Sequence, residues 1–335
     1  MTAPLIRSIR KTLAGASLAA AALIAPFAAQ AEDKLTIGTV VWAGYGPFYV
    51  ADELDLYEQF GLDVDLQFFN DPALIPSAMA SGAVDGGMLT YDQVVGSVAK
   101  GLDHRVVMPI DFSDGGDAIV ADKSITSVAD FKGKQVGYNP LSPSDFLLAY
   151  ALQINGMTEK DIRPVNMTPE AIPSAMASGN LPVGVTYEPN VSQIVGMGKG
   201  ERFHVVYSSK EAPGLITDGL VFYEEVIAEQ PAAITAMIKG YQAGLDYMQA
   251  NPEESATIIG KVLGVSGPEA TEQMSGVYNI PLAEMAEVFE ESESTMSFYG
   301  SGAVIADLLV KNQQIPAAPD FANTFDASFV EALNE

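Results

Sequence analysis

Carboxylate side chains stand at many of the predicted strand ends of this 335-residue chain, and no Arg or Lys accompanies them. The acidic residues at these positions are Asp71, Asp92, Asp111, Asp114, Asp145 and Glu188. Carboxylates accept hydrogen bonds from N–H groups, and they pair with cations. A pocket of this kind suits an amine, a urea-like or guanidine-like group, or a nitrogen-rich heterocycle. A sulfonate or nitrate pocket usually offers basic groups or many N–H donors instead.

Aromatic and hydroxyl side chains accompany these carboxylates. Trp42 and Tyr45 lie in a Gly-flanked loop after the first predicted strand, where a ring can stack on a ligand or contact a cation. An ordinary core or rim aromatic is the alternative reading for both. Ser142 and Ser144 precede an apolar helical run, so either could cap a helix whose free N–H groups bind an anion. A plain helix cap explains the same two residues.

An internal repeat points to two similar halves. Residues 75–82 (Ile-Pro-Ser-Ala-Met-Ala-Ser-Gly) recur unchanged as residues 172–179. A Thr-Tyr-acid triplet follows each copy, at 90–92 and at 186–188, at the end of a predicted strand. Ligands bind outside the carboxyl ends of strands in open α/β sheets, so we expect the two triplets to face each other across a cleft. The predicted ligand-binding residues are Trp42, Tyr45, Asp71, Thr90, Tyr91, Asp92, Asp111, Ser113, Asp114, Asn139, Ser142, Ser144, Tyr187 and Glu188.

Several function classes conflict with the composition. The formal net charge of −26 disfavours binding of nucleic acid through its phosphates. The absence of Cys excludes disulfides, thiol catalysis and thiolate metal sites, and there are only two histidines, His104 and His204. Neither histidine accompanies a Gly-x-Ser-x-Gly nucleophile motif. The acidic segment 111–117 lacks the ligand spacing of a calcium loop. We therefore expect no catalytic residue, no metal and no cofactor.

Alternating strands and helices are predicted along the chain. The predicted strands are 35–41, 63–69, 85–89, 105–110, 135–138, 163–167, 183–187 and 203–207. Helices are predicted near 48–60, 73–81, 91–100, 144–155 and 170–178, and the chain is mostly helical from about residue 231. This order predicts largely parallel sheets with helices on both faces. No low-complexity linker separates the halves, so we expect the chain to cross between them on strands.

Residues 1–31 have the pattern of a secretory signal peptide. A positive start (Arg7, Arg10 and Lys11) precedes an apolar stretch and the small-residue site Ala29-Gln-Ala31. A transmembrane anchor is the alternative, but the apolar run is short and Glu32 follows it directly. We expect export to the periplasm and cleavage after Ala31.

Six short motifs occur in an order that is informative as a set. They are residues 44–51, 58–64, 81–85, 116–120, 130–136 and 187–189. Their order resembles the periplasmic solute-binding proteins of ABC importers, in the nitrate/taurine/sulfonate and pyrimidine-precursor group (the NMT1/SsuA-like family). One motif departs from the family, which usually has Val-Asp-Ala where this chain has Leu181-Pro-Val-Gly184.

This resemblance implies an α/β, two-lobed periplasmic binding protein fold of type II. Each lobe would be a mostly parallel sheet flanked by helices, with the ligand cleft between the lobes. We expect residues 32–117 and 215–335 to form one lobe and residues 118–214 the other. The family implies a monomer that is not an enzyme and that delivers a small-molecule ligand to a membrane permease and its ATPase.

The resemblance and the residues disagree about the ligand. The family favours taurine, an alkyl sulfonate or nitrate, whereas the carboxylates favour a nitrogen compound. Taurine, a zwitterion, would satisfy both arguments. A secreted enzyme on the same fold is the alternative of another class, although family relatives that make the thiamine pyrimidine rely on Cys and His chemistry.

Overall fold

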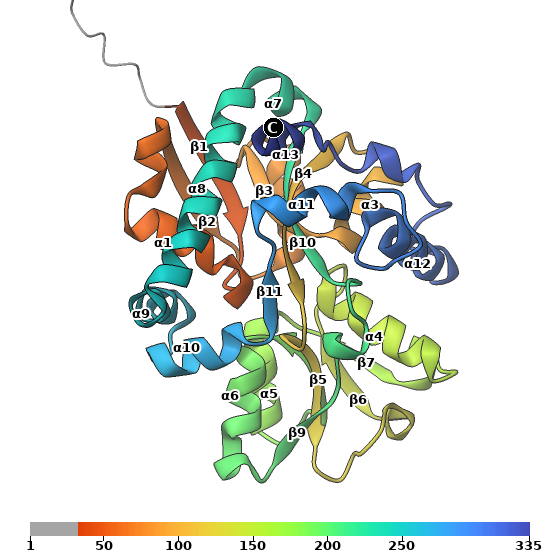
Figure 1. The fold of residues 1–335 in the computed structure, drawn as a ribbon. Coiled ribbons are helices and arrows are strands. Elements are labelled where there is room, and N and C mark those ends of the chain that lie inside the picture. The colour runs from red at the N-terminus through yellow and green to blue at the C-terminus, as the bar shows by residue number, and fades with distance from the viewer. Residues whose placement is uncertain (1–32) are drawn as a thin grey trace, which may run out of the picture. The chain divides into compact units, whose positions relative to one another are not determined.

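Two β-sheets form the frame of the protein (Figure 1). The computed structural model describes residues 33–335, and the predicted signal peptide, residues 1–31, lies outside the described residues. The first sheet has six strands in the order β11-β4-β10-β3-β1-β2. They are β1 (Asp33–Thr39), β2 (Leu62–Phe68), β3 (Gly86–Thr90), β4 (His104–Ser113), β10 (Thr217–Tyr223) and β11 (Val277–Asn279).

The second sheet has five strands in the order β7-β6-β8-β5-β9. They are β5 (Asp117–Asp122), β6 (Gln135–Tyr138), β7 (Arg163–Asn166), β8 (Val183–Tyr187) and β9 (Phe203–Ser208). We call the parts of the molecule around the two sheets the first and the second lobe. The exact limits predicted for the lobes, near residues 118 and 215, stay a prediction.

Most strands in each sheet run in one direction. In the first sheet β1 pairs in parallel with β2 and β3, while β10 pairs antiparallel with β3 and β4. In the second sheet β6 pairs in parallel with β7 and β8, while β5 pairs antiparallel with β8 and β9. The prediction of mostly parallel sheets is thus confirmed, and β5, β10 and β11 are the strands that oppose it.

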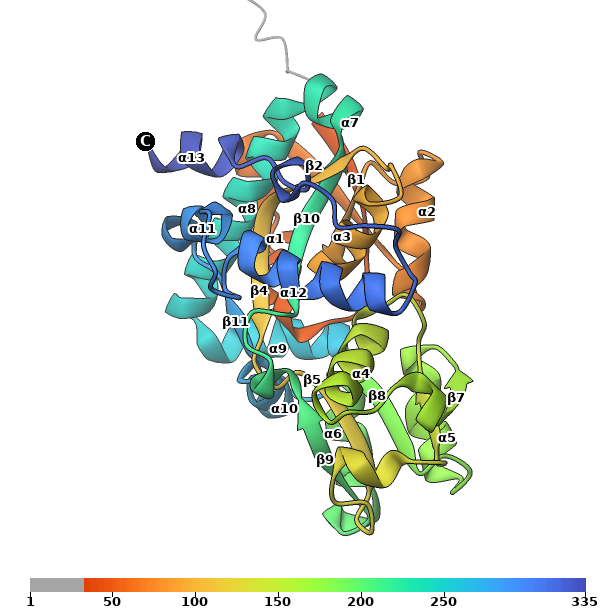
Figure 2. The same cartoon turned by 90° about the vertical axis from the view of Figure 1, so that its right-hand side faces the viewer.

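Helices lie on both sides of the first sheet (Figure 2). In chain order they are α1 (Gly46–Glu53), α2 (Ile75–Ala80), α3 (Tyr91–Val98), α7 (Glu224–Glu229), α8 (Pro231–Ala250), α9 (Pro252–Leu263), α10 (Gly267–Met274), α11 (Leu282–Phe289), α12 (Phe298–Lys311) and α13 (Ser328–Asn334). The helix predicted for 48–60 is broken, because Asp55 takes a left-handed backbone (φ 52°) between α1 and a 3-10 turn at Leu56–Phe60. The C-terminal third is mostly helical, as expected.

The helices beside the second sheet are α4 (Pro143–Ile154), α5 (Ile172–Ala177) and α6 (Asn190–Gly196). Helix α4 begins as the sequence predicts, with Ser142 as its cap, since the Ser142 Oγ accepts a hydrogen bond from the Ser144 N–H (3.2 Å).

The repeated octapeptide packs identically in both lobes. It forms α2 on the first sheet and α5 on the second, and each helix lies over two glycines that face each other on neighbouring strands. A Cβ atom added at Gly87 would lie 2.7 Å from Ile75 Cγ2, and one at Gly184 would lie 2.5 Å from Ile172 Cγ2. Any larger side chain would therefore lift the helix off the sheet.

Two strand-to-strand crossings join the sheets, from β4 into β5 and from β9 into β10, as expected from the absence of a linker. The crossings touch, because the Ser113 and Ser209 hydroxyls are 2.8 Å apart and the Gly115 N–H donates to Ser209 Oγ (2.8 Å). The N–H of Gly116 donates to the carbonyl of Gly276, which precedes β11. These bonds hold the edges of the two sheets together at one place.

Within residues 33–335, no helix has both the length and the apolar character that crossing a membrane requires.

Candidate functional site

A small cavity lies where the two lobes meet. The first lobe lines it with Val40, Trp42, Tyr45, Pro72, Met88, Thr90, Gln93 and Asp218, and the second with Asp117, Pro143 and Tyr187. Its volume is about 20 Å³, which is room for about one water molecule. The two lobes are therefore closed on each other here, and we call this place the cleft.

Aromatic rings from both lobes close the cleft. The ring of Trp42, after β1, meets the ring of Tyr187, at the end of β8, edge-on with 5.9 Å between centroids. Both rings are buried. The Tyr187 hydroxyl is buried and has no hydrogen-bond partner among the described residues. An unpaired buried hydroxyl is costly, so this atom is available to a ligand.

Two facing carboxyl groups lie beneath the aromatic loop. Asp111 on β4 stands opposite Asp218 on β10, and both are almost fully buried. The Tyr45 hydroxyl donates to Asp218 Oδ1 (2.6 Å), and the Trp42 indole N–H lies 3.4 Å from both oxygens of Asp111. The loop that carries Trp42 and Tyr45 is thus held against the sheet by hydrogen bonds to these two carboxyl groups.

The electrostatics of this pair favour retained protons. Burial, and then repulsion from Asp218, raises the pKa of Asp111 well above its usual value. Burial also raises the pKa of Asp218, although the hydrogen bond from Tyr45 acts in the opposite direction. No Arg or Lys lines the cleft within the described residues. The pair therefore lacks a cation of its own.

Asp117 contributes a third buried carboxyl group from the other lobe. It is the first residue of β5, directly after the crossing, and its N–H donates to the Ser113 Oγ (3.1 Å). Burial raises the pKa of Asp117 to about 8, with the Ser113 hydrogen bond opposing and the charges of Asp218 and Asp92 adding to it. Carboxyl groups of both lobes thus face one closed space.

Four of the predicted residues line the cleft, namely Trp42, Tyr45, Thr90 and Tyr187, and Asp111 contacts Trp42 directly. Asp92 and Ser142 line a neighbouring cavity instead. Asn139 and Ser144 lie beside the start of α4, and the Asn139 Oδ1 and Ser144 Oγ are buried without partners in the described part of the chain. As ligand contacts, these residues stay a prediction.

Five predicted residues have other roles in the structure. Asp71 caps a 3-10 turn by accepting from the Ala73 N–H (3.0 Å), and Glu188 accepts from the Ser192 N–H (2.9 Å) at the start of α6. Ser113 belongs to the crossing, and Asp114 is exposed. The Tyr91 hydroxyl bonds to Thr324 (2.7 Å) and its ring packs on Phe298, inside the first lobe.

A one-residue shift separates the two tyrosines of the repeat. Gly87 and Gly184 are equivalent, because the same Ile and Met of the repeated helix cover them. Three residues later the first lobe has Thr90 and the second has Tyr187. Successive residues of a strand point to opposite sides, so Thr90 and Tyr187 face the cleft while Tyr91 turns into the core.

Asp117, Asp218 and Gln93 line the cleft but are absent from the predicted set. Asp218 lies in β10, a strand that was not predicted at all. The continuous apolar run Leu-Val-Phe-Tyr at 220–223, close to the expected lobe limit, is the signal that could have revealed this buried strand.

The close approach of Gly116 to Trp42 gives a direct test of the cleft. A Cβ atom at Gly116 would overlap the six-membered ring of Trp42 and lie 3.0 Å from the Gly276 carbonyl oxygen. Gly116→Ala is expected to displace the indole, lower the stability by about 1–3 kcal/mol and shift the Trp emission. Urea denaturation and fluorescence measure both effects. Gly196→Ala, where nothing lies within 4 Å, is the matched control; equal behaviour of the two variants would contradict the packing described.

The two histidines lie outside the cleft. His104 is buried against Tyr223 at the end of β4 remote from Asp111, and the His204 Nε2 lies 2.7 Å from the Ile125 carbonyl oxygen. Among residues 33–335, no three His, Asp or Glu side chains are arranged to hold a metal ion.

Two lobes with a closed cleft at their junction define the periplasmic binding protein fold. The periplasmic aliphatic sulphonate binding protein SsuA from Escherichia coli superimposes with a TM-score of 0.68 at 19% identity, covering 88% of this chain and 97% of that chain. The desulfurization enzyme DSZB also superimposes, with a TM-score of 0.63 at 11% identity, covering 90% and 98%. The fold alone therefore leaves both binding and catalysis open.

The chain belongs to the NMT1/THI5-like family, whose model matches residues 42–255. A Brucella abortus (strain 2308) protein, named only as a binding protein, is 27% identical over 216 residues, which are 64% of this chain and 67% of the relative. The taurine-binding periplasmic protein of Escherichia coli (strain K12) is 26% identical over 291 residues, 84% of this chain and 87% of the relative. The resemblance drawn from the sequence motifs is thus confirmed.

Proposed function

We propose that this protein is the exported solute-binding component of an ABC importer and that it captures a small nitrogen-containing solute. The ligand class is an amine, a urea-like or guanidine-like compound, or a pyrimidine-like heterocycle. The lobes close around it, and the protein delivers it as a monomer to a membrane permease and its ATPase. The NMT1/THI5-like family and the names of the relatives support the transport role.

One observation carries the choice of ligand: two buried carboxyl groups, Asp117 and Asp218, line the cleft, a third, Asp111, lies behind Trp42, and no basic side chain lines the cleft. A sulfonate or nitrate placed beside Asp117 and Asp218 would be repelled or would need both to stay protonated. A cation would replace the missing positive charge, and the faces of Trp42 and Tyr187 would add to its binding.

The size of the cleft supports capture by closure. A cavity of about 20 Å³ cannot hold an organic molecule, so the lobes must separate to admit one. The two crossings, which meet at Ser113 and Ser209, are the natural place for this motion because the chain passes from one sheet to the other there. We propose the lobe limits near residues 118 and 215 on the same ground.

Taurine remains the second candidate because a relative that matches 84% of this chain is named for it. Its ammonium group would satisfy the carboxyl groups of the cleft. Its sulfonate would need the N–H groups at the start of α4, next to Asn139 and Ser144. An enzyme on the same fold is the alternative of another class, supported by DSZB. We propose that this chain is not one, since the cleft offers neither a thiol nor a histidine.

A ligand panel tests the proposal, with the single tryptophan as the reporter. Trp42 lies in the cleft, so a ligand bound there changes its emission. We expect methylguanidinium or 4-aminopyrimidine to shift the emission and to raise the melting temperature. At a ligand concentration of 100 times Kd, the free energy of unfolding should rise by about 2.7 kcal/mol. Binding of ethanesulfonate or nitrate without any nitrogen base would overturn the ligand class.

The transport role needs a second measurement. Native mass spectrometry of the protein purified from the periplasm should show a small molecule that is released intact on partial unfolding. Release of a chemically altered molecule, with turnover of added ligand, would favour the enzyme instead.

A further inference from the structure

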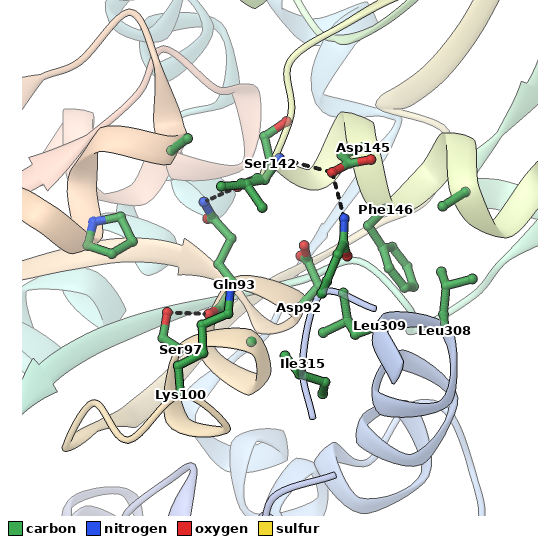
Figure 3. Close-up of a pocket in the computed structure, with 16 residues that line it drawn as sticks. Asp92, Gln93, Ser97, Lys100, Ser142, Asp145, Phe146, Leu308, Leu309 and Ile315 are labelled. Atoms are coloured by element: carbon green, nitrogen blue, oxygen red, sulfur yellow. Dashed lines mark hydrogen bonds between the residues drawn. The ribbon is translucent and has the colours of Figure 1, made fainter. Parts of the chain in front are cut away.

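A second cavity, which we call the side chamber, lies between α3 and α12 of the first lobe and α4 of the second (Figure 3). Its volume is about 150 Å³. An apolar cavity of this size holds a benzene molecule, so the chamber has room for about six or seven non-hydrogen atoms. Gln93 lines both the side chamber and the cleft. The chamber is therefore a neighbour of the cleft and a separate space.

One wall of the side chamber is hydrocarbon. Phe146 and Ala149 on α4, Leu308 and Leu309 on α12, and Ile315 line it. Phe146, Leu308, Leu309 and Ile315 are buried in the closed molecule. This wall favours an occupant with an apolar body, which would gain about 25 cal/mol for each Å² of apolar surface that it buries.

A buried carboxyl group, that of Asp92, lines the chamber. Asp92, in the first turn of α3, is only 6% exposed, and its Oδ1 has no hydrogen-bond partner among the described residues. Asp145 and Phe146 of α4 line the chamber together with Asp92 of α3 (Figure 3). The Oδ2 of Asp145 is already occupied, because it accepts from the Leu141 N–H (3.0 Å) and the Gln314 amide (3.1 Å).

The other charged group around the chamber is Lys100, which is exposed at its rim. Lys100 forms no ion pair with any carboxylate in the described part of the chain. The buried carboxylate of Asp92 therefore has neither a cation nor a donor for Oδ1. A buried carboxylate in this situation calls for a positively charged hydrogen-bond donor.

We propose that the side chamber binds a compact amine with a ring-sized apolar body, whose ammonium group pairs with the carboxylate of Asp92 and whose hydrocarbon packs against Phe146, Leu309 and Ile315. The site goes beyond the ligand of the cleft and does not depend on it. The occupant contacts both lobes, so it stabilises their closed arrangement. A neutral ring lacks the charge for Asp92, and an anion is repelled by Asp92 and Asp145.

Isothermal titration calorimetry with cyclohexylamine, a cation at pH 7.5, tests the site, and cyclohexanol is the neutral probe. The amine is expected to bind at least tenfold more tightly than the alcohol. Asp92→Asn is nearly identical in shape and should remove this tenfold preference. Asp65→Asn, an equal change of charge on the exposed edge strand β2, should leave the preference intact.

A second variant tests the apolar wall. Ala149→Leu adds three carbon atoms to the chamber and should weaken the binding of cyclohexylamine at least tenfold. Circular dichroism checks that the variant is folded. Lys100→Met should retain amine binding, because Lys100 takes no part in it. Equal affinities of amine and alcohol, or full amine affinity in Asp92→Asn, would overturn the proposal.

The ligand of the cleft serves as a control that shows which of the two cavities cyclohexylamine occupies. Cyclohexylamine in the side chamber should not compete with methylguanidinium, whereas loss of methylguanidinium binding at saturating cyclohexylamine would place the amine in the cleft and contradict the proposal. Methylguanidinium should still shift the Trp42 emission in Asp92→Asn. A wild-type protein that binds methylguanidinium but not cyclohexylamine would overturn this inference alone. A wild-type protein that binds cyclohexylamine but not methylguanidinium would count against the proposed function alone.

Discussion

Asp117→Asn is expected to remove cation binding and, at the same time, to make the ligand-free protein more stable. The carboxylate faces the cleft without a basic partner, so its loss should weaken a guanidinium or ammonium ligand by about 2–4 kcal/mol, or 30-fold to 1000-fold. Fluorescence titration of Trp42 measures this loss. A residue with both effects is a functional residue that the fold itself does not need.

The gain in stability follows from the buried charge. Burial raises the pKa of Asp117 from an ordinary 3.8 to about 8, which corresponds to roughly 6 kcal/mol against folding once the pH exceeds 8. The Asn amide is also polar and buried, so we expect Asp117→Asn to gain only about half of this free energy. The melting temperature of the variant should then be at least ~5 °C higher than that of the wild type. Asp65→Asn on the exposed β2 strand is the control. A variant that binds poorly and also melts lower would mean that Asp117 is structural.

The affinity for a permanent cation should rise steeply with pH. The folded, empty protein keeps protons on Asp117 and on the Asp111–Asp218 pair, and a cation must displace at least one of them. With a pKa of about 8 at Asp117, one released proton makes binding roughly 50-fold tighter at pH 8 than at pH 6. Titration calorimetry of methylguanidinium in two buffers of different ionisation enthalpy counts that proton.

The stability of the ligand-free protein should change with pH in the opposite sense to the affinity, falling as the pH rises. A carboxyl group with a raised pKa disfavours folding increasingly as the pH rises from about 4, its unfolded value, to about 8, its folded value. The stability difference between Asp117→Asn and the wild type should therefore grow over that range and level off above it. A sulfonate ligand would need the protons and bind more weakly as the pH rises, so a flat or falling affinity profile contradicts the proposal.

The fold could be predicted from local signals. Strand β1 is rich in β-branched residues, helix α4 begins just after its cap Ser142, and helix α8 begins at Pro231, as the caps and the apolar spacing indicate. The break at Asp55 and the strands β5, β10 and β11 could not. The three strands pair with β4, β8 and β9, which are distant from them in sequence or follow a turn that the pattern does not specify. Such pairing is a tertiary effect that no window of sequence contains.

The cleft was only half predictable for a physical reason. Residues at the carboxyl ends of parallel strands were sought, and this rule found Trp42, Thr90 and Tyr187. Strands β5 and β10 run the other way, so their beginnings reach the same edge. Asp117 and Asp218 lie at those beginnings, and the rule passes over them. Two of the three carboxyl groups on which the ligand argument depends were thus found only in the structure.

The matching glycine pairs under α2 and α5 bear on the history of this chain. Gly38 faces Gly87 and Gly137 faces Gly184, and the same eight residues lie on each pair. A duplicated segment is free to diverge wherever packing tolerates change, and these contacts tolerate almost none. The two copies accordingly share the same helix and differ at the strand ends, where a threonine lies in one wall of the cleft and a tyrosine in the other. Residues at those ends can be exchanged for another ligand while the packing of the repeated helices stays the same.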